Sequence, residues 1–286
     1  MPETTTLHSH HENIHVERTG FVVTVTLDRP ESKNACTGEM FVALGATFRN
    51  LSWSGARVIV LTGAGGEFCS GADLGGPRNA PDSEVQRPTE TDAPNTMPSR
   101  PMHTMTDSMR ALGDSVLAIH QCPVPVISKV DGLCVGAGLG VALAADLTWC
   151  SDRARFSAIF AKRGLSLDFG TSWLLRQRLG VHKAKELALT AKIISGTEAF
   201  ALGLVNTVVP VAELDAAVDA VAATIASGPP IALSASKREL DLASEGSLAH
   251  ALEIETLAQG VNVQTADTIE ALTAYAQRRE PNFEGR

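Results

Sequence analysis

Apolar residues fall into short runs that predict β-strands. Residues 21–27 read FVVTVTL, an alternating β-branched pattern that is typical of a strand. Residues 58–61 (VIVL) and 124–130 (VPVISKV) are short and mostly apolar, as in buried strands. Similar runs predict strands at residues 147–150, 155–156 and 205–209.

Elsewhere the apolar residues recur at helical spacing. Phe41, Leu44 and Phe48 lie three or four residues apart, which predicts a helix over residues 37–50. Residues 132–145 begin as a glycine-rich turn and continue as a helix of small residues. The same spacing predicts helices at residues 105–119, 173–179, 183–190, 197–202, 211–227, 231–242, 248–259 and 266–278.

The order of these elements predicts the domain organisation. Alternating strands and helices indicate an α/β core over residues 14–210, and residues 211–286 form a helical region that packs on the core or on a neighbouring subunit. Residues 1–13 are expected to be a disordered polar tail. Residues 75–102 are rich in Pro, Ser, Thr and Asn and predict a long surface loop. Both a lid over a site and a plain insertion fit that composition.

Charge and hydropathy limit the classes of partner that the chain is expected to bind. A formal net charge of −8 over 286 residues argues against a nucleic-acid binder, because phosphate contacts need clustered Lys and Arg. No run reaches the roughly 18 apolar residues of a membrane span. The first residues also lack the basic and apolar regions of a secretory signal. Neither a nucleic acid nor a membrane is therefore an expected partner.

The cysteine and histidine patterns indicate reduced thiols and no metal site. The five cysteines are odd in number and show no C-x-x-C spacing, so free thiols in a cytoplasmic protein are expected. His8, His10 and His11 have no carboxylate or cysteine partner at fixed spacing. The chain has no H-E-x-x-H motif.

Two small-residue turns carry the candidate chemistry. FCSGADL (68–74) follows the strand predicted at 58–61, and DGLCVGAGLG (131–140) follows the strand predicted at 124–130. Ligands bind at the carboxyl ends of strands in α/β sheets, and small residues allow close approach to the backbone. The second turn leads into a helix whose first N–H groups have no partner within that helix. One N–H from each turn, aimed at one carbonyl oxygen, would form an oxyanion hole.

Two other motifs that these glycine-rich segments suggest are incomplete. GAGLG (136–140) lacks the sixth-position glycine and the later acidic residue of a dinucleotide-binding fingerprint. GAGG (63–66) lacks the Lys-Ser/Thr of a phosphate loop. Each turn alone is better explained by tight packing, whereas the two together, in register with a family pattern, favour a site.

These segments resemble the crotonase superfamily, the enoyl-CoA hydratase/isomerase family. The resemblance implies a repeated β-β-α spiral core, a C-terminal helical trimerisation region, an acyl-CoA substrate of fatty acid metabolism, and a homotrimer or dimer of trimers. CoA is then part of the substrate, and no separate cofactor is implied. The matching stretches are LDRPESKNACT (27–37), VIVLTGAGGEFCSGADL (58–74), PVPVISKVDGLCVGAGLGVALAAD (123–146), ISGTEAFALGLVNTVVP (194–210) and REPNFEGR (279–286).

The resemblance also assigns site residues. It places the two oxyanion-hole N–H groups at Ala72 and Ala137. It places CoA contacts, mostly through backbone groups, at Lys33, Ala35, Ser70, Ala72, Asp73 and Leu74, with Phe283 added from the C-terminal helix.

The acids of the family's hydratases are replaced here. By the resemblance, their two glutamates align with Gly140 and Phe160, so ordinary two-glutamate hydration is not expected. GLSLDFG (164–170) resembles the G-L-x-x-D-x-G stretch of isomerase-like members, whose Asp shuttles a proton between carbons. Asp168 is therefore a candidate proton shuttle, with a pKa raised by desolvation. The alternative is that Asp168 caps the helix that follows.

Three other acids have structural interpretations. Asp146 ends a helix-to-strand turn, and Asp73 is expected to begin and cap a helix. Glu198, three residues after Ser195, is placed for a capping box.

Three functions remain open from the sequence. The first is an isomerase or hydratase of unsaturated acyl-CoA. The second is a protein that binds acyl-CoA with little or no turnover, which the two missing glutamates favour. The third is a structural protein with a vestigial pocket.

Overall fold

The computed structural model describes residues 3–75, 102–244 and 246–286. Nearly all of the loop predicted at residues 75–102 lies outside the described residues. The strands are β1 (Thr4–Thr6), β2 (Ile14–Thr19), β3 (Val22–Leu27), β4 (Val58–Gly63), β5 (Val126–Val130), β6 (Leu133–Val135), β7 (Leu147–Ser151), β8 (Arg155–Ser157), β9 (Ile194–Ser195) and β10 (Thr207–Val209). The α-helices are α1 (Gly38–Leu51), α2 (Met102–His120), α3 (Ala137–Leu143), α4 (Thr171–Thr190), α5 (Gly196–Ala201), α6 (Leu214–Ala226), α7 (Pro230–Ala243), α8 (Leu248–Asn262) and α9 (Ala266–Gln277). Short 3₁₀ turns form at η1 (Pro30–Ser32), η2 (Ile159–Arg163) and η3 (Val211–Glu213).

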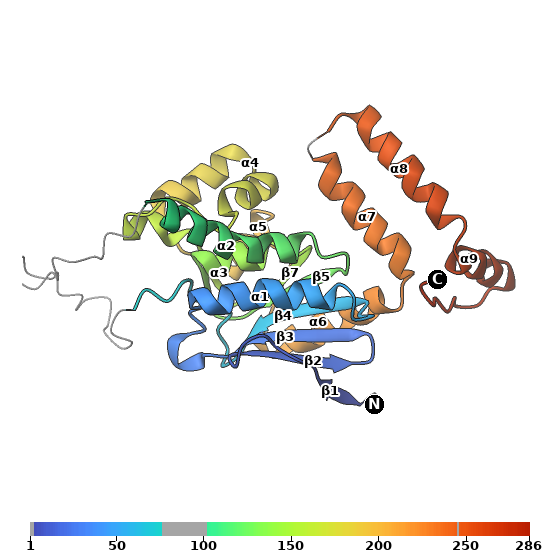
Figure 1. Cartoon of the computed structure of the whole chain (residues 1–286), viewed down its shortest axis with the longest axis horizontal. Helices are drawn as coiled ribbons and strands as arrows, with labels where there is room; N and C mark the ends of the chain where they lie inside the picture. Colours follow the sequence, from blue (N-terminus) through green and yellow to red (C-terminus); the bar gives the residue numbers. More distant parts are fainter. Residues whose placement is uncertain (1–2, 76–101, 245) are drawn as a thin grey trace, which may run out of the picture.

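The main sheet places the ends of β4 and β5 side by side. Its strand order is β1-β2-β3-β4-β5-β7-β10, in which β1, β2 and β3 pair antiparallel and the strands from β3 onward pair parallel (Figure 1). Leu61 on β4 pairs with Ser128 on β5. A second, small sheet has the order β6-β8-β9. The turns that follow β4 and β5 therefore leave the main sheet at the same edge.

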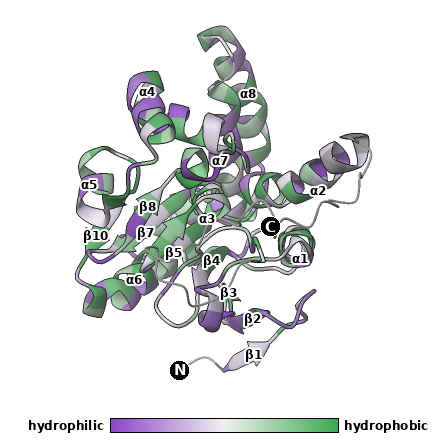
Figure 2. Cartoon of the chain, turned by 90° about the vertical axis from the view of Figure 1, so that its left-hand side faces the viewer, coloured by the Kyte–Doolittle hydropathy of each residue, from purple (hydrophilic) through white to green (hydrophobic). Residues whose placement is uncertain are grey.

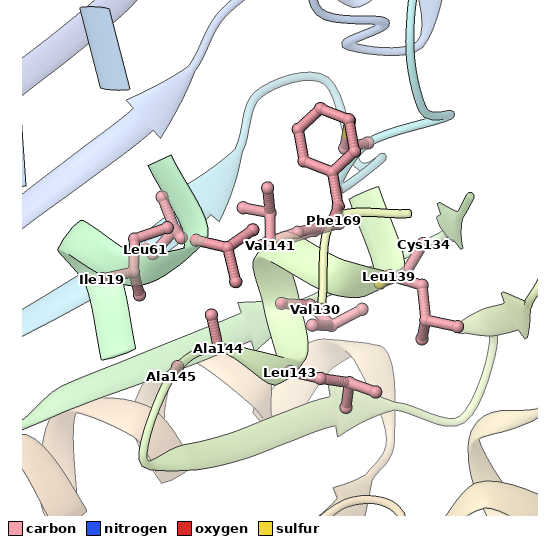
Figure 3. Packing of buried hydrophobic residues seen from close by; sticks show 14 of the residues in the cluster. Leu61, Ile119, Val130, Cys134, Leu139, Val141, Leu143, Ala144, Ala145 and Phe169 are labelled. Atoms are coloured by element: carbon pink, nitrogen blue, oxygen red, sulfur yellow. The ribbon is translucent and has the colours of Figure 1, made fainter. Parts of the chain in front are cut away.

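The strands at the centre of the sheet are buried on both faces. Ile59 and Leu61 of β4 belong to the core beneath α1, α2 and α3, whereas Val58 and Val60 pack in a second cluster with α6. This division follows from the two-residue period of a strand. Figure 3 shows the first core close to the site, where Leu139, Val141 and other α3 side chains pack. The site is thus built on rigid, buried elements.

The C-terminal helices extend away from the sheet. The α7–α8 hairpin stands apart from the α/β core in Figure 1. Neither α7 nor α8 has a residue in the buried class, and hydrophobic residues lie along α8 in Figure 2. A partly buried ion pair from Lys237 to Asp146, 2.8 Å long, attaches α7 to the core. Large apolar side chains stay exposed in this region: Leu240, Leu248, Leu252, Leu257, Val261, Val263, Ile269, Leu272 and Tyr275.

The observed elements largely follow the hydrophobic pattern, and the differences include the following. Residues 4–6, expected in a disordered tail, instead form β1 against β2, so that expectation is wrong there. The helices predicted at 173–179 and 183–190 are the two parts of α4, which breaks at Gly180 because its φ is 69° and its ψ is 169°. The segment predicted as a glycine turn and helix begins with the strand β6.

The structure also bears on the expectations drawn from composition. The cysteines are all free and buried. The residues that the structure describes contain no group of three or more His, Cys, Asp or Glu able to hold a metal ion. Over the same part of the chain no single helix has the length and apolar character needed to cross a membrane; Val211–Ala226 and Pro230–Ala243 meet those criteria only together, and they are bent by 106°.

Candidate active site

A short backbone ladder joins the two predicted turns. The Cys69 N–H donates to the Leu133 carbonyl over 2.8 Å, and the Val135 N–H donates to the Cys69 carbonyl over 3.1 Å. Cys69 and Cys134 thereby form an isolated parallel bridge. The pairing follows from the neighbouring ends of β4 and β5, which deliver both turns to one edge of the sheet.

The amides of Ala72 and Ala137 lie close together beyond this ladder. Gly71 has a φ of 105°, and a Cβ added to it would lie 3.7 Å from the Ala137 nitrogen and 3.1 Å from the Val135 carbonyl oxygen. The Ala72 N–H follows Gly71 directly in the chain. Only a residue without a side chain permits this approach.

Both amides have unused hydrogen-bonding capacity. Within residues 3–75, 102–244 and 246–286, neither the Ala72 nor the Ala137 N–H has a hydrogen-bond acceptor. Ala137 is the first residue of α3, and its N-cap, Gly136, supplies no side-chain cap. The N-terminus of a helix favours negative charge. The pair is therefore suited to hold one oxygen that becomes negative.

The predicted CoA-binding segments form a second ladder on the other side of the first turn. The Ser70 N–H donates to the Lys33 carbonyl over 3.0 Å, and the Asp73 N–H donates to the Cys36 carbonyl over 2.8 Å. Lys33 has a left-handed backbone, with φ 52°. Residues 33–36 thus lie beside residues 70–73, as the assignment requires.

Arg29 and Asp73 stabilise this ladder from the side. The Arg29 side chain, 9% exposed, donates to the Ala35 carbonyl over 2.5 Å and pairs with the Asp73 carboxylate over 3.1 Å. Asp73 does not begin a helix: its other carboxylate oxygen accepts from the Gly75 N–H over 3.0 Å. The helix-capping prediction for Asp73 is therefore wrong. Leu74 follows with a largely exposed side chain.

Phe283 lies elsewhere in the same chain. It follows the end of α9 at Gln277, so it is not helical. Its carbonyl accepts from Arg57 over 2.7 Å, and Arg57 precedes the first residue of β4. The turns lie at the opposite end of that six-residue strand, about 20 Å away. The structure therefore does not bring Phe283 to the other candidate residues within one chain.

Asp168 lies ahead of α4 but does not cap it. The N-cap of α4 is Gly170, without a side-chain cap, so the capping alternative is wrong. Only the backbone of Asp168 helps the helix start, because its carbonyl accepts from the N–H and hydroxyl of Thr171. One carboxylate oxygen of Asp168 is buried and has no hydrogen-bond partner among the residues that the structure describes. Burial raises the pKa of Asp168 to about 6.

The lack of a side chain at Gly140 allows the segment that carries Asp168 to approach α3. A Cβ on Gly140 would overlap the Phe169 carbonyl oxygen and lie 2.7 Å from the Phe169 Cβ. Phe169 has a φ of 47°, and its ring packs on Phe41 with centroids 4.4 Å apart. Gly140 lies about one helical turn from Ala137. The segment that carries Asp168 therefore rests on the helix that starts with the candidate oxyanion-hole amide.

Phe160 stands at the position that the resemblance assigns to the second family glutamate. Phe160 lies in η2 and is 5% exposed within the main core. A carboxylate in its place would have to lose its hydration in an apolar core, which is costly. Both replaced positions thus have structural roles in this chain.

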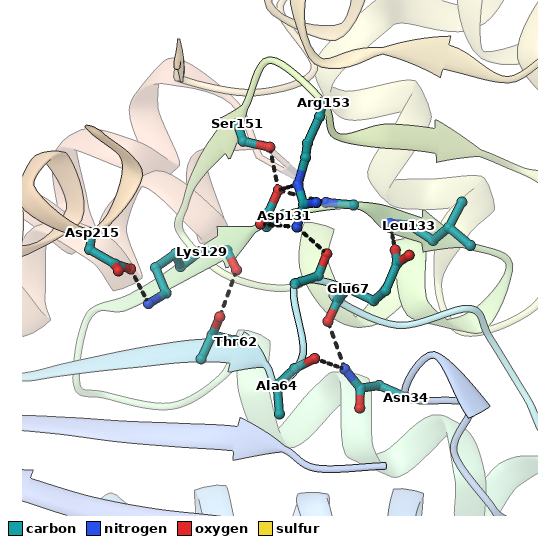
Figure 4. Close-up of polar contacts among 12 residues, drawn as sticks. Asn34, Thr62, Ala64, Glu67, Lys129, Asp131, Leu133, Ser151, Arg153 and Asp215 are labelled. Atoms are coloured by element: carbon teal, nitrogen blue, oxygen red, sulfur yellow. Dashed lines mark hydrogen bonds and ion pairs between the residues drawn. The ribbon is translucent and has the colours of Figure 1, made fainter. Parts of the chain in front are cut away.

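Two polar residues near the turns were not identified from the sequence. Asn34, fully buried, accepts from the Arg29 N–H over 2.8 Å and donates to the carbonyls of Ala64 and Glu67 over 2.9 and 2.6 Å (Figure 4). The Glu67 carboxylate accepts from the Leu133 N–H. No local pattern marks either residue, because their partners lie in other segments of the chain.

The remaining acids have the structural roles predicted for them. Glu198 and Ser195 form the capping box of α5. Asp146 accepts from the Val126 N–H over 2.7 Å and from Lys237. Its burial raises the pKa of the Asp146 carboxyl.

The chain matches known proteins over nearly its whole length. The family model described as enoyl-CoA hydratase/isomerase matches residues 17–286. The chain is 34% identical to “Probable enoyl-CoA hydratase” of Rhodobacter capsulatus, covering 92% of this chain and 94% of that protein. It is 31% identical to the peroxisomal Delta(3,5)-Delta(2,4)-dienoyl-CoA isomerase of Arabidopsis thaliana, covering 90% of each. A structure from Thermobifida fusca, assigned as an enoyl-CoA hydratase in complex with CoA, has a TM-score of 0.76 at 31% identity, covering 88% of this chain and 93% of that one.

Proposed function

The chain belongs to the enoyl-CoA hydratase/isomerase family and has its crotonase-like fold, and we propose that it moves a double bond along an unsaturated acyl-CoA. In this proposal the N–H groups of Ala72 and Ala137 hold the thioester oxygen, and Asp168 carries the proton. The observation that carries the choice of isomerisation is the partly buried Asp168 carboxylate, one oxygen of which is buried and has no hydrogen-bond partner among the described residues, combined with Gly and Phe at the two glutamate positions.

The chemistry needs one base and one oxyanion site. Asp168 takes a proton from C2 of a 3-enoyl thioester, and the electron pair spreads to the thioester oxygen as a dienolate. The two amides stabilise that oxygen in a fixed geometry. The proton then returns from Asp168 to C4, which leaves the double bond between C2 and C3. A single carboxylate suffices because it ends each turnover in the form in which it started.

The raised pKa of Asp168 supports this role. A carboxyl group with a pKa of about 6 is ionised near neutrality and is a stronger base than an ordinary aspartate. Its buried oxygen makes no hydrogen bond to any described residue, so no such bond would have to break before it accepts a proton. Hydration would need a second carboxylate, which acts as the base that activates water, and Gly140 and Phe160 supply none.

We also propose that the protein is a homotrimer or a dimer of trimers and needs no cofactor beyond the CoA of its substrate. The many exposed large apolar side chains of α7–α9 support an assembly, because apolar side chains gathered on a surface often mark an interface. The position of Phe283 supports it too: this residue can contact CoA only if CoA is bound by another copy. Sedimentation analysis should give three or six times the mass of one chain.

The proposed reaction is tested by ultraviolet absorbance. Purified protein mixed with a 3-enoyl-CoA should increase the absorbance of the conjugated 2-enoyl thioester, and it should leave crotonyl-CoA unhydrated. Rapid loss of the crotonyl-CoA absorbance would favour hydration instead. Tight binding of both thioesters without any change in absorbance would select the alternative of an acyl-CoA-binding protein with little turnover.

A further inference from the structure

The ladder between the two turns has an unusual third hydrogen bond. In a parallel pair, the rung before the bond from Cys69 to Leu133 would run from the Leu133 N–H to the Glu67 carbonyl. Here the Leu133 N–H donates to the Glu67 carboxylate, and the Glu67 carbonyl accepts from the Asn34 amide over 2.6 Å. The side chain of Glu67 thus takes the position that its own carbonyl would occupy in a regular ladder.

The backbone around this carboxylate is closely fitted. Gly132, with φ 57°, has no room for a side chain, because an added Cβ would overlap the Glu67 carboxylate and the Gly66 carbonyl. Figure 4 shows the Glu67 carboxylate at Leu133 and the Glu67 carbonyl at Asn34. A single residue therefore contacts the second turn with its side chain and the CoA-binding segment with its backbone.

A separate ion pair holds the start of the second turn. Arg153 contacts both oxygens of Asp131 at 2.6 Å and donates to the Gly66 carbonyl over 2.8 Å. Asp131 also accepts from the Ser151 hydroxyl over 2.6 Å. These contacts fix residue 131, whereas Glu67 acts two residues further along the chain, four residues before Ala137.

We infer that Glu67 is a positioning residue of the oxyanion hole. Its carboxylate fixes the distance between the turn that carries Ala72 and the turn that carries Ala137. A charged acceptor makes a shorter and stronger bond to an N–H than a neutral one, which suits a bond that sets geometry. This inference rests on the proposed function, since it assumes that the two amides share one oxygen.

The test compares Glu67→Ala with Glu67→Gln, which keeps an oxygen able to accept the Leu133 N–H. The probe is an acyl-CoA whose thioester is conjugated to an electron-donating aromatic ring. Its absorbance moves to longer wavelength when the carbonyl is polarised, so it reports the hole directly. Glu67→Ala should abolish most of that shift and lower kcat about ten- to a hundredfold. This loss in rate is smaller than the roughly 10²- to 10³-fold loss expected when one oxyanion-hole donor is removed completely. KM should change less than threefold, and Glu67→Gln should recover most of the shift.

Glu198→Ala is the matched control. Glu198 also accepts a backbone N–H, from Ser195 over 2.8 Å, but it caps α5. That variant should keep the shift and kcat of the wild type. If Glu67→Ala does not fold, Glu67→Asp takes its place: its shorter side chain should reduce the shift.

Two outcomes distinguish a failure of the inference about Glu67 from a failure of the proposed function. If the wild type shifts the probe and the Glu67 variants shift it equally, the inference is overturned while the proposed function stands. If the wild type binds the probe without any shift, the proposed function fails and the inference fails with it.

Discussion

The two parts of the candidate site are built in opposite ways. The turns that carry Ala72 and Ala137 are joined by a backbone ladder and by the side chain of Glu67, whose own carbonyl is held by the Asn34 amide. The segment that carries Asp168 rests on α3 at Gly140 and packs its Phe169 ring on Phe41 of α1, and one buried oxygen of the Asp168 carboxylate has no partner among the described residues.

This difference matches what each part has to do. Donors that stabilise a developing charge are effective when they are fixed in advance, because nothing then has to reorganise during the reaction. A base must instead keep a free lone pair and a pKa near the working pH. Hydrogen bonds strengthen the first part and would disable the second.

Removing the base should have the largest effect. Asp168→Asn preserves size and removes the proton carrier, so kcat for the isomerisation should fall about 10²- to 10⁴-fold. Asp219→Asn, on the exposed face of α6, is the control and should keep the wild-type rate. Steady-state assays with a 3-enoyl-CoA measure both. An Asp168→Asn variant with full activity would exclude Asp168 as the proton carrier.

Displacing the base segment should have the next largest effect. Gly140→Ala places a methyl group against the Phe169 backbone, so the segment must move. A shift of about 1 Å can cost roughly a hundredfold in rate, and overpacking should lower the free energy of unfolding by about 1–3 kcal/mol. Gly113→Ala in α2, where an added Cβ meets no atom within 4 Å, is the control. Equal rates and stabilities for both variants would show that Gly140 does not support this segment.

The pH dependence sharpens the assignment of the base. The reaction needs the carboxylate form of Asp168, whose pKa is raised to about 6. Below that pH, kcat/KM should rise about tenfold per pH unit, and it should level off above it. A profile flat from pH 5 to pH 8 would contradict the assignment. Measurement in several buffers separates this titration from protein unfolding.

The smallest expected effect is on the pH dependence of the folding stability. Burial raises the pKa of Asp168 from 3.8 to about 6, so the folded protein binds its proton more tightly than the unfolded chain. Stability is therefore lost as pH rises through this window. Asp168→Asn should be as stable as the wild type below about pH 4, and its thermal midpoint should be higher by a few degrees above pH 6. Scanning calorimetry across that range, with Asp219→Asn as control, tests the sign.

Much of the core was predictable because periodicity reports burial directly. The strands β3, β4, β5 and β7 appear where their apolar runs predicted them. β2 was missed because Ile14 and Val16 alone give its buried face too short a pattern. β6 was hidden inside a glycine-rich segment whose pairing partner, β8, lies further along the chain.

The site was only partly predictable for a related reason. The two turns at neighbouring strand ends were predicted to meet, and the family resemblance assigned Ala72 and Ala137 within them; the structure brings these segments together. The contacts of Asn34 and Glu67 depend on partners that only the fold delivers, so no local pattern indicated them. The placement of Phe283 in the C-terminal helix was wrong because the chain leaves α9 before reaching it.

A crystal structure of the Asp168→Asn variant with a bound 3-enoyl-CoA tests the account most directly. The thioester oxygen should lie about 2.7–3.1 Å from both the Ala72 and the Ala137 nitrogens, with the residue 168 side chain facing C2 and C4 of the acyl chain. A thioester oxygen bound by neither amide, or a residue 168 side chain turned away from the acyl chain, would contradict it.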